Sequence, residues 1–527
     1  MNIAVPDRWA RFLAAALVAS ACTPISSADD GAGTSSSEEG AGAANSSSST
    51  VASTGAPANT STEAPASTST GEASPGTTDA TTPEDDTTSA TVDDGTTHGE
   101  GEDSIADTGD PGGDGRDGDF YVAVDGRDDD PGTIEAPFGT IQRAIDVAEP
   151  GDLVYVRGGV YAIVQPARPG IGIHFHKSGR SDAERIRYFA YPGEVPVFEF
   201  ENLQIQPDPE YTSGVVVEGA WLHLKGFEIR NVPMNTRSNT GLSVRGGAHH
   251  DIFELLDIHH NFGSGMFIHT TLGGHQVLNC DSHDNYDPLS HQGDGENADG
   301  FGVHYQTEGE STVFRGCRAW WNSDDGWDFI SQEVPVLVED SWAMGHGYIH
   351  SGTGRAGNGN GFKIGSSKTG IRHVVRNCVA WGNRASGFYA NHSSGGNDWF
   401  NNTSYDNGTQ FDMLASTWDA QGNRTDGVVL TGDRAHVMRN NIAFPLDNRS
   451  MEGVDARFNT WDLGITPSER DFLSLSEQGF MGPRNSDGSL PTLDFLRLAP
   501  QSAMIDAGVE VGLSFRGTAP DLGAYER

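Results

Sequence analysis

Four aspartates and one lysine are the residues of this chain whose types and spacing could do chemistry together. They are Asp299, Asp324, Asp325, Asp328 and Lys363. Carboxylate oxygens are ligands that Ca²⁺ prefers, and four carboxylates held close together would repel one another without a cation. A lysine can accept a proton once its surroundings lower its pKa, which an arginine cannot do. Since the chain has four lysines against 29 arginines, its ordinary cation is arginine.

A repeat in the surrounding sequence must position these residues. Each anchor residue of the repeat is followed, usually five places later, by a polar residue that is most often asparagine. The anchors are Leu256, Cys280, Cys317, Ser341, Cys378, Asn402 and Asn441. Their spacing alternates between 24 and 37 residues, with a last step of 39. This alternation predicts a constant coil with an additional loop on every second turn.

Six segments of the same region share a second pattern, which is glycine, large apolar residue, variable residue, apolar residue. They are Gly241–Val244, Gly265–Ile268, Gly300–Val303, Gly326–Phe329, Gly361–Ile364 and Gly387–Ala390. Two apolar residues that flank a variable one have the period of a strand with one buried face. A short repeat that carries such strands, without a long helical periodicity, predicts an all-β parallel β-helix solenoid.

Stacked coils convert sequence distance into spatial distance. Asp328 and Lys363 occupy the variable position of adjacent coils, so the pattern predicts that they lie about 4.8 Å apart on the outer face. Asp299 and Asp325 both directly precede the glycine that begins the second pattern, and Asp324 is next to Asp325. The register therefore predicts a Ca²⁺ site on one outer face. Two simpler interpretations stay open: a solvated acidic turn, and a Lys363 that only forms an ion pair with Asp328.

The first 21 residues have the layout of a secretory signal peptide. Arg8 and Arg11 precede an apolar stretch, residues 12–19, that is too short to cross a membrane. Residues 19–22 resemble a bacterial lipobox, which makes Cys22 a candidate lipidation site, with simple secretion as the alternative. We expect a protein that is secreted or anchored by lipid to the outer membrane at the bacterial cell surface.

Composition predicts the remaining organisation. Residues 22–118 are rich in Ser, Thr and Asp and have few large apolar side chains, so we expect a disordered tether. The domain is expected at 119–527, with its core coils at about 220–445, and as a monomer. The net charge of −41 argues against nucleic acid as a partner. Cys280, Cys317 and Cys378 are expected as buried apolar residues, and a disulfide between Cys280 and Cys317 is left open.

Motifs in two parts of the chain resemble those of known proteins. The amphipathic segment before Pro150 and the strand Leu153–Val156 resemble the N-terminal cap, with a short helix, of secreted right-handed β-helix proteins. Asn297–Phe301, Asn322–Asp328 and Gly357–Lys363 resemble three successive motifs of the family 9 polysaccharide lyases, which are β-helical pectate lyases. The resemblance is strong over about 256–407 and absent from the tether.

This resemblance implies a function and roles for the five residues. Asp299, Asp324, Asp325 and Asp328 would be the Ca²⁺ ligands and Lys363 the catalytic base of β-elimination at an acidic polysaccharide, with pectate as the default substrate. A base that must be neutral implies that activity rises towards alkaline pH. Further residues near the expected site could contact sugar or belong to the ordinary surface. They are His304, Tyr305, Arg384, Tyr389, Asn391 and His392.

Two other functions remain as alternatives at this point. Paired carboxylates also occur in β-helical glycoside hydrolases, but that chemistry gives the adjacent lysine no task. A surface adhesin or glycan-binding β-helix would need the aspartates only to brace its coils.

Overall fold

The computed structural model describes residues 116–205, 211–234, 238–290, 293–349, 354–419 and 421–527. All of them belong to one compact unit, Glu100–Arg527. The predicted signal peptide, the candidate lipidation site Cys22 and residues 22–115 of the predicted tether lie outside the described residues. In the described part of the chain, no helix is long and apolar enough to span a membrane.

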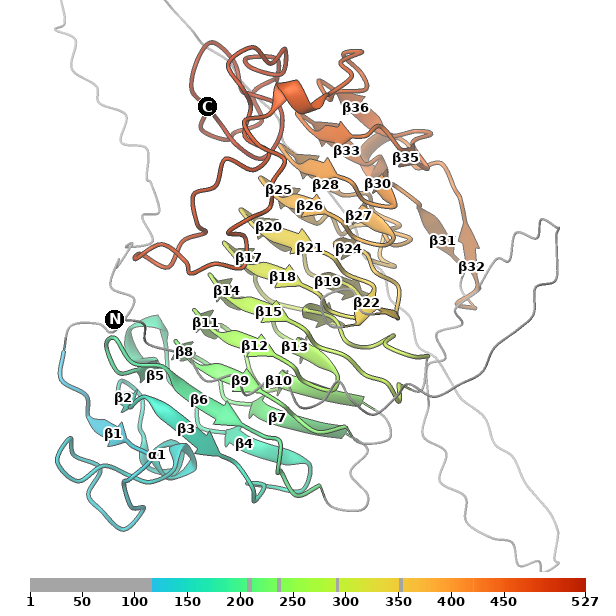
Figure 1. Ribbon diagram of the computed structural model, residues 1–527. Helices are drawn as coiled ribbons and strands as arrows, with labels where there is room; N and C mark the ends of the chain where they lie inside the picture. Colours follow the sequence, from blue (N-terminus) through green and yellow to red (C-terminus); the bar gives the residue numbers. More distant parts are fainter. Residues whose placement is uncertain (1–115, 206–210, 235–237, 291–292, 350–353, 420) are drawn as a thin grey trace, which may run out of the picture. The chain divides into compact units, whose positions relative to one another are not determined.

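Three long sheets make up the domain, and the chain visits them in turn (Figure 1). Sheet 1 contains β1 (Phe120–Val122), β2 (Leu153–Val156), β5 (Ile186–Ala190), β8 (Leu222–Lys225), β11 (Ile252–Glu254), β14 (Gln276–Leu278), β17 (Thr312–Arg315), β20 (Val336–Glu339), β25 (Val374–Arg376), β28 (Asp398–Phe400), β33 (Val437–Arg439) and β36 (Asp455–Arg457). Sheet 2 contains β3 (Gly159–Ala162), β6 (Pro196–Glu199), β9 (Glu228–Arg230), β12 (Asp257–His259), β15 (Asp281–His283), β18 (Arg318–Trp320), β21 (Trp342–Met344), β26 (Val379–Trp381), β29 (Thr403–Tyr405) and β34 (Ile442–Phe444). Sheet 3 contains β4 (Ile171–Phe175), β7 (Tyr211–Val217), β10 (Ser238–Gly246), β13 (Ser264–Thr270), β16 (Phe301–His304), β19 (Trp327–Ile330), β24 (Phe362–Ile364), β27 (Ser386–Tyr389), β30 (Thr409–Asp412) and β35 (Asn448–Arg449).

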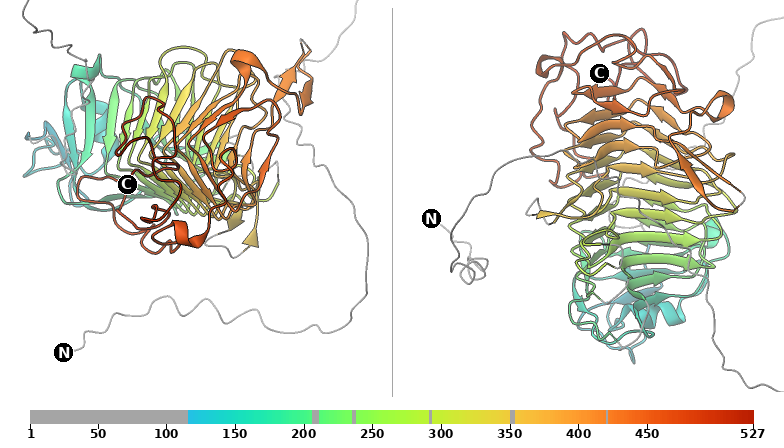
Figure 2. Two further views of the ribbon diagram at one scale, coloured as in Figure 1. Left: turned by 90° about the horizontal axis from the view of Figure 1, so that it is seen from above. Right: turned by 90° about the vertical axis from the view of Figure 1, so that its right-hand side faces the viewer.

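Strands of successive coils pair in parallel within each sheet, as β19 does with β24. Figure 2 shows the coils stacked along one axis. The predicted parallel β-helix is therefore confirmed. Smaller elements lie outside the three sheets: the antiparallel hairpins β22 (Tyr348–Ile349) with β23 (Gly354–Arg355) and β31 (Ser416–Trp418) with β32 (Arg424–Asp426), and the 3₁₀ turns η1 (Asp182–Glu184), η2 (Gly432–Arg434) and η3 (Glu469–Asp471).

A short helix closes the N-terminal end of the stack. Helix α1 (Ile141–Val147) begins after Thr140, whose hydroxyl accepts a hydrogen bond from the Arg143 amide at 3.2 Å. Its buried face packs against β1 and β4, the first strands of two sheets. The helix thus covers apolar surface that the first coil would otherwise expose, and the predicted N-terminal capping helix is confirmed.

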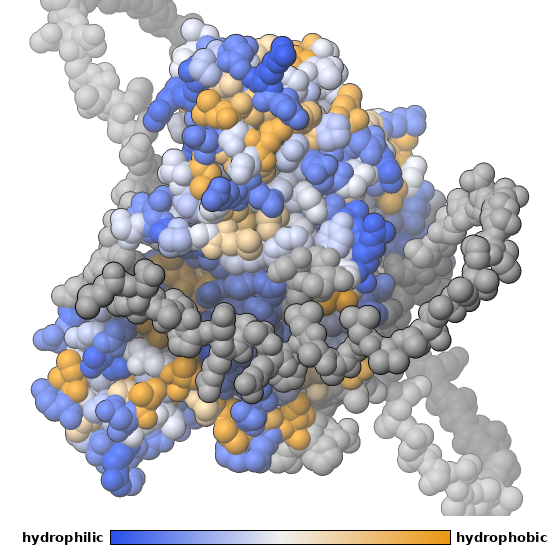
Figure 3. Space-filling view, in the orientation of Figure 1, coloured by the Kyte–Doolittle hydropathy of each residue, from blue (hydrophilic) through white to orange (hydrophobic). Residues whose placement is uncertain are grey.

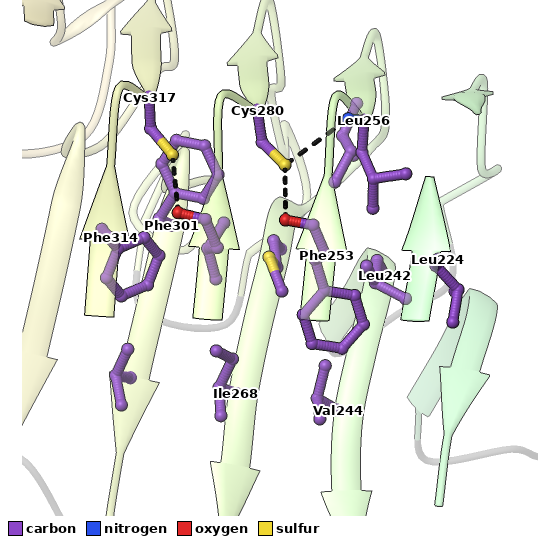
Figure 4. Packing of buried hydrophobic residues seen from close by; sticks show 14 of the residues in the cluster. Leu224, Leu242, Val244, Phe253, Leu256, Ile268, Cys280, Phe301, Phe314 and Cys317 are labelled. Carbon is purple, nitrogen blue, oxygen red and sulfur yellow. Dashed lines mark hydrogen bonds between the residues drawn. The ribbon is translucent and has the colours of Figure 1, made fainter. Parts of the chain in front are cut away.

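The core fills the space between the three sheets with apolar side chains from every coil (Figure 4). Cys280 and Cys317 lie in this core, and each thiol donates to a carbonyl oxygen of the preceding coil, that of Phe253 and of Val277, at 3.3 Å. Both cysteines and Cys378 are free and fully buried. They are therefore buried core residues, as expected, and the described chain forms no disulfide between Cys280 and Cys317.

The asparagines of the repeat form a buried ladder along the turns. The Oδ1 of Asn285 accepts from the backbone amide of Asn261 at 3.0 Å and from its side chain at 3.1 Å. Asn285 in turn donates to Oδ1 of Asn322 at 2.9 Å. Each amide side chain satisfies buried backbone groups of its neighbours, which explains why asparagine recurs five places after the anchor.

The C-terminal segment after β36 folds back over the outer face of sheet 2 (Figures 1 and 2). Phe480 packs against Trp342 and Trp381, with ring centroids 5.3 Å and 4.3 Å away. Arg484 reaches further, to Oδ1 of Asp281 on β15, at 2.5 Å. Figure 3 shows hydrophobic residues gathered over this segment. The segment therefore covers several coils of sheet 2. The four aspartates and Lys363 lie on the outer face of a different sheet, sheet 3.

Candidate active site

The five residues singled out in the sequence meet on the outer face of sheet 3. Asp328 on β19 is the register partner of Lys363 on β24. Gly302 and Tyr389 are the next residues along the same outward column, one on each side. The amide of Gly300 donates to the carbonyl of Asp325, which places Asp299 and Asp325 at the same position of adjacent coils. The predicted register is confirmed.

The carboxylates form a compact and buried group. Oxygen atoms of Asp299, Asp324 and Asp325 lie within 4.8 Å of one another. Asp328 is also buried, with 4% of its surface exposed. Backbone amides hold three of the carboxylates in place. Asp325 donates to Asp299 at 3.2 Å, Asn358 donates to Asp324 at 2.6 Å, and Asn360 donates to Asp325 at 2.6 Å.

Lys363 lies at the edge of this group, and 14% of its side chain is exposed. Its Nζ is 3.1 Å from Oδ2 of Asp325 and 3.2 Å from Oδ2 of Asp328. The ion pair with Asp328 that the sequence left open is therefore present. Both carboxylates favour the charged form of the amine at this position.

The electrostatics of the cluster are dominated by burial and by mutual repulsion. Burial, followed by the charges of neighbouring aspartates, raises the pKa values of Asp299 and Asp324 well above their usual range. For Asp328, burial acts in the same direction, but Lys363 and His304 lower its pKa below the usual value. Burial lowers the pKa of Lys363, and the four aspartates more than offset this, so that it rises well above its ordinary value.

The cluster fits a hard divalent cation. Its donors are all carboxylate oxygens, the set that Ca²⁺ prefers. Oδ1 of Asp328 is buried and accepts no hydrogen bond from the described residues, which is costly for a carboxylate unless another positive group is near. One ammonium group also cannot balance four carboxylates. The residues that could hold such an ion are Asp299, Asp324, Asp325 and Asp328.

The other candidate residues fall into different environments. His304, at the end of β16, has its Nε2 3.7 Å from Oδ2 of Asp328 and so faces the cluster. Tyr305 is 49% exposed, and the centroid of its ring lies 5.7 Å from that of the His304 ring. Asn391, after β27, donates to the carbonyl of Phe329 on β19, two coils away, at 3.3 Å and so ties these coils together.

Arg384 faces the loop that carries part of the cluster. Its guanidinium donates to the carbonyls of Gly357 and Asn358, the latter at 3.1 Å. The amide of Asn358 in turn donates to Asp324, so Arg384 helps to position this carboxylate through the loop. These contacts give it a structural task that the sequence did not predict.

Tyr389 and His392 belong to a chain of hydrogen bonds beside Lys363. The hydroxyl of Tyr389 is 3.0 Å from Nε2 of His392, and Nδ1 of His392 is 3.0 Å from Oδ1 of Asp426 on the hairpin strand β32. Burial raises the pKa of Tyr389 above its usual value. The chain links the outward column of sheet 3 to the hairpin β31–β32, next to the place where a substrate would lie.

Two residues near the site, Asn360 and Asp426, were not predicted from the sequence. Asn360 occupies the column of Asp299 and Asp325, directly before the pattern glycine, and its side chain donates to Asp325 at 2.9 Å. The register already carried that signal. Asp426, by contrast, lies on a hairpin outside the repeat, and no pattern in the sequence connects it with His392.

Comparisons with known proteins agree with this geometry. A family model described as the Pel9A-like, right handed beta helix region matches residues 120–441. The chain belongs to the Pel9A-like family. The resemblance to family 9 polysaccharide lyases that the three motifs indicated is thereby confirmed, and the parallel β-helix is a right-handed one.

Several relatives show how far the similarity extends. Pectate lyase L of Dickeya chrysanthemi is 35% identical over 415 residues, which cover 77% of this chain and 90% of that protein. The crystal structure of pectate lyase Pel9A has a TM-score of 0.63 at 33% identity, covering 77% of this chain and 96% of the other. A solved rhamnogalacturonan lyase has a TM-score of 0.65 at 29% identity, covering 72% and 96%. This member of the Pel9A-like family is a polysaccharide lyase.

Proposed function

We propose that this lyase is calcium-dependent and cleaves pectate by β-elimination, with Lys363 as the base. The observation that carries the proposal is the position of Lys363 Nζ, 3.1 Å and 3.2 Å from two of four buried carboxylates on one outer face. The activity for which its relatives are named, as in pectate lyase L, supports pectate as the substrate.

The chain's own residues divide the work as follows. Asp299, Asp324, Asp325 and Asp328 would hold the ion on the outer face of sheet 3. When bound, Ca²⁺ supplies positive charge that binds a uronate carboxylate and stabilises the negative charge that develops at C5. Lys363, from β24, accepts the C5 proton. The C4–O bond then breaks as the C4=C5 double bond forms, and the departing oxygen takes a proton from water, which leaves a 4,5-unsaturated sugar at the new chain end.

Protonation of Lys363 links the ion to the chemistry. The four aspartates raise its pKa, so an ammonium group is favoured while their charges are uncompensated. Neutralising the carboxylates removes that effect and frees the amine to accept a proton. Activity should therefore require a divalent cation and should rise towards alkaline pH.

A rhamnogalacturonan backbone is the second candidate substrate. The rhamnogalacturonan lyase of known structure is nearly as similar in sequence as pectate lyase Pel9A, at 29% against 33% identity, and has a comparable TM-score. The exposed Tyr305 and the half-buried His304 beside the cluster are residues that could distinguish the two backbones.

The test is an elimination assay with polygalacturonate, rhamnogalacturonan and a methyl-esterified pectin. The ultraviolet absorbance of unsaturated uronates should rise with polygalacturonate and Ca²⁺ and should not rise in EDTA. New reducing ends without that absorbance would favour the hydrolase alternative. Binding without any product would favour the glycan-binding alternative, and no reaction with any uronate polymer would overturn the proposal.

We also propose that the protein reaches the cell surface as a monomer, through its leader and a lipid on Cys22. The basis is the signal-peptide layout and the lipobox-like residues 19–22. Fractionation of cells that express the full chain and its Cys22→Ser variant tests this, because the variant should move from the membrane fraction to the medium. Light scattering of the purified protein tests the monomer.

A further inference from the structure

A second group of metal-type side chains lies on the outer face of sheet 2, away from the aspartates on sheet 3. We call it the histidine cluster, and it consists of His259, His260, His283 and Asp284. His259 on β12 and His283 on β15 are register partners in adjacent coils. Their rings stack at 4.7 Å, and His283 also stacks on Trp320 at 4.0 Å.

The turn after each strand supplies the other two members. His260 and Asp284 directly follow β12 and β15, and both have positive φ, 55° and 51°. The chain bends at the same point of both coils, and the amide of His260 donates to the carbonyl of His283 at 3.2 Å. Stacking therefore brings two imidazoles, a third imidazole and a carboxylate together from residues 24 apart in sequence.

Carboxylates hold one nitrogen of each stacked ring. Nε2 of His259 is 3.1 Å from Oε1 of Glu228, and Nε2 of His283 is 3.0 Å from Oδ1 of Asp257. Glu228 and Asp257 are themselves register partners. A carboxylate at this position accepts a hydrogen bond from the Nε2–H group of a neutral imidazole, which leaves the lone pair on Nδ1 to act as a ligand. Metal-binding histidines are commonly oriented in this way.

The Nδ1 atoms face the rest of the cluster. Nδ1 of His259 is 2.7 Å from Nδ1 of His260, and Nδ1 of His283 is 3.0 Å from Oδ2 of Asp284. Ligand atoms of His260, His283 and Asp284 all lie within 4.8 Å of one another. Metal–ligand bonds of roughly 2.1 Å in tetrahedral geometry place donor atoms about 3.4 Å apart, between the 2.7 Å separation and the 4.8 Å upper limit found here, so the rings would have to adjust on binding.

We propose that the histidine cluster binds a divalent transition-metal ion such as Zn²⁺, through the Nδ1 atoms of its histidines and the carboxylate of Asp284. Mixed imidazole and carboxylate donors suit such ions, whereas Ca²⁺ prefers oxygen alone, so the two sites of this chain select different cations. The ion would join the coils of β12 and β15. The C-terminal segment after β36 also reaches these coils, where Arg484 contacts Asp281 on β15.

Protonation of His283 competes with metal binding at this cluster. Burial lowers the pKa of His283, but Asp257 and Asp284 more than offset this and raise it to about 9. The stacked His283 could then serve only as an imidazolium between two carboxylates, and this alternative predicts no metal binding.

Calorimetric titration of the metal-depleted, full-length protein with Zn²⁺ tests the proposal. Saturating Ca²⁺ is present throughout, so that the oxygen site on sheet 3 is filled. One Zn²⁺ should bind per chain, and it should raise the thermal unfolding midpoint. His260→Gln, His283→Gln and Asp284→Asn should each weaken binding by about ten-fold or more, because even the outer partners of metal ligands contribute about 10–100-fold.

Two controls keep the result interpretable. His249→Gln removes a histidine from a pair with Nδ1 atoms 2.8 Å apart that belongs to no metal-type group in the described chain, so it should leave Zn²⁺ binding unchanged. His260 is exposed, so His260→Gln should keep the circular dichroism spectrum and the lyase activity of the parent. Absent binding by the parent protein, or equal binding by the cluster variants and the control, would overturn the proposal.

Discussion

Replacing Lys363 separates the two tasks of its side chain, which are to neutralise the aspartates and to accept a proton. Lys363→Ala removes the ammonium group 3.1 Å and 3.2 Å from Asp325 and Asp328, both buried. Loss of one partner of a buried ion pair costs about 3–5 kcal/mol, and solvent screens little of this because only 14% of the Lys363 side chain is exposed. Lys363→Arg keeps the positive charge but cannot become neutral near physiological pH.

The two variants should therefore differ in stability but not in activity. Both should lose about 10²–10⁴-fold in kcat, as expected for removal of a general base. In urea unfolding with EDTA, Lys363→Ala should lose most of the stability quoted above, while Lys363→Arg should stay much closer to the parent. Added Ca²⁺ should reduce the deficit of Lys363→Ala, because it compensates the same carboxylates.

Lys368→Ala is the matched control for these measurements. Its Nζ is 2.7 Å from Glu333, but both side chains are exposed, at 50% and 39%, so the pair should contribute little and the variant should resemble the parent. If Lys363→Arg retains activity within a few-fold of the parent, the base assignment is wrong. If Lys363→Ala and Lys368→Ala unfold alike in EDTA, the reasoning about the buried ion pairs is wrong.

Three further changes probe the aspartate site and the fold. The folded-state pKa of Asp299 is raised above its unfolded value, so its stability contribution is complete below the unfolded pKa and is lost as pH rises through the folded pKa. In EDTA the parent should therefore lose stability relative to Asp299→Asn as pH increases, and parallel pH profiles from urea unfolding would contradict this. Arg384→Ala frees the loop whose Asn358 amide binds Asp324, and calorimetry should show about 10–100-fold weaker Ca²⁺ binding, whereas unchanged binding would remove the positioning role. Asn285→Ala leaves buried ladder groups of adjacent coils unpaired and should lower the free energy of unfolding by at least about 1–3 kcal/mol, and a smaller loss would show that the ladder adds little.

The register of the central coils was accessible from the sequence because stacking imposes a strict repeat. Each coil must place an apolar residue in the core and an amide in the turn ladder, so Cys280 and Asn285 recur in the same frame as Cys317 and Asn322. Once that frame was known, the pairing of Asp328 with Lys363 followed.

Contacts outside the repeat could not be predicted in this way. The C-terminal segment has no strands after β36, and Phe480 meets Trp381 across about a hundred residues of chain. The hairpin β31–β32, which lies outside the three sheets of the repeat, brings Asp426 to His392. Such contacts depend on the surface against which an irregular segment packs, and the sequence repeat contains no information about that surface. The coils before β10 follow the same stacking but vary in length, so the sequence repeat could not be detected there.

The same stacking rule accounts for both proposed metal sites on this protein. In a parallel β-helix, residues at one register position lie about 4.8 Å apart, whatever the length of the loop between them. Two coordinating side chains at that position already approach the separation that a shared ion requires, and a turn residue next to them adds a further donor. Asp299 with Asp325 is one instance, 26 residues apart, and His259 with His283 is another, 24 residues apart. A single substitution at such a position on an adjacent coil can therefore extend a site without altering the core between the sheets, because the outward side chains point away from that core.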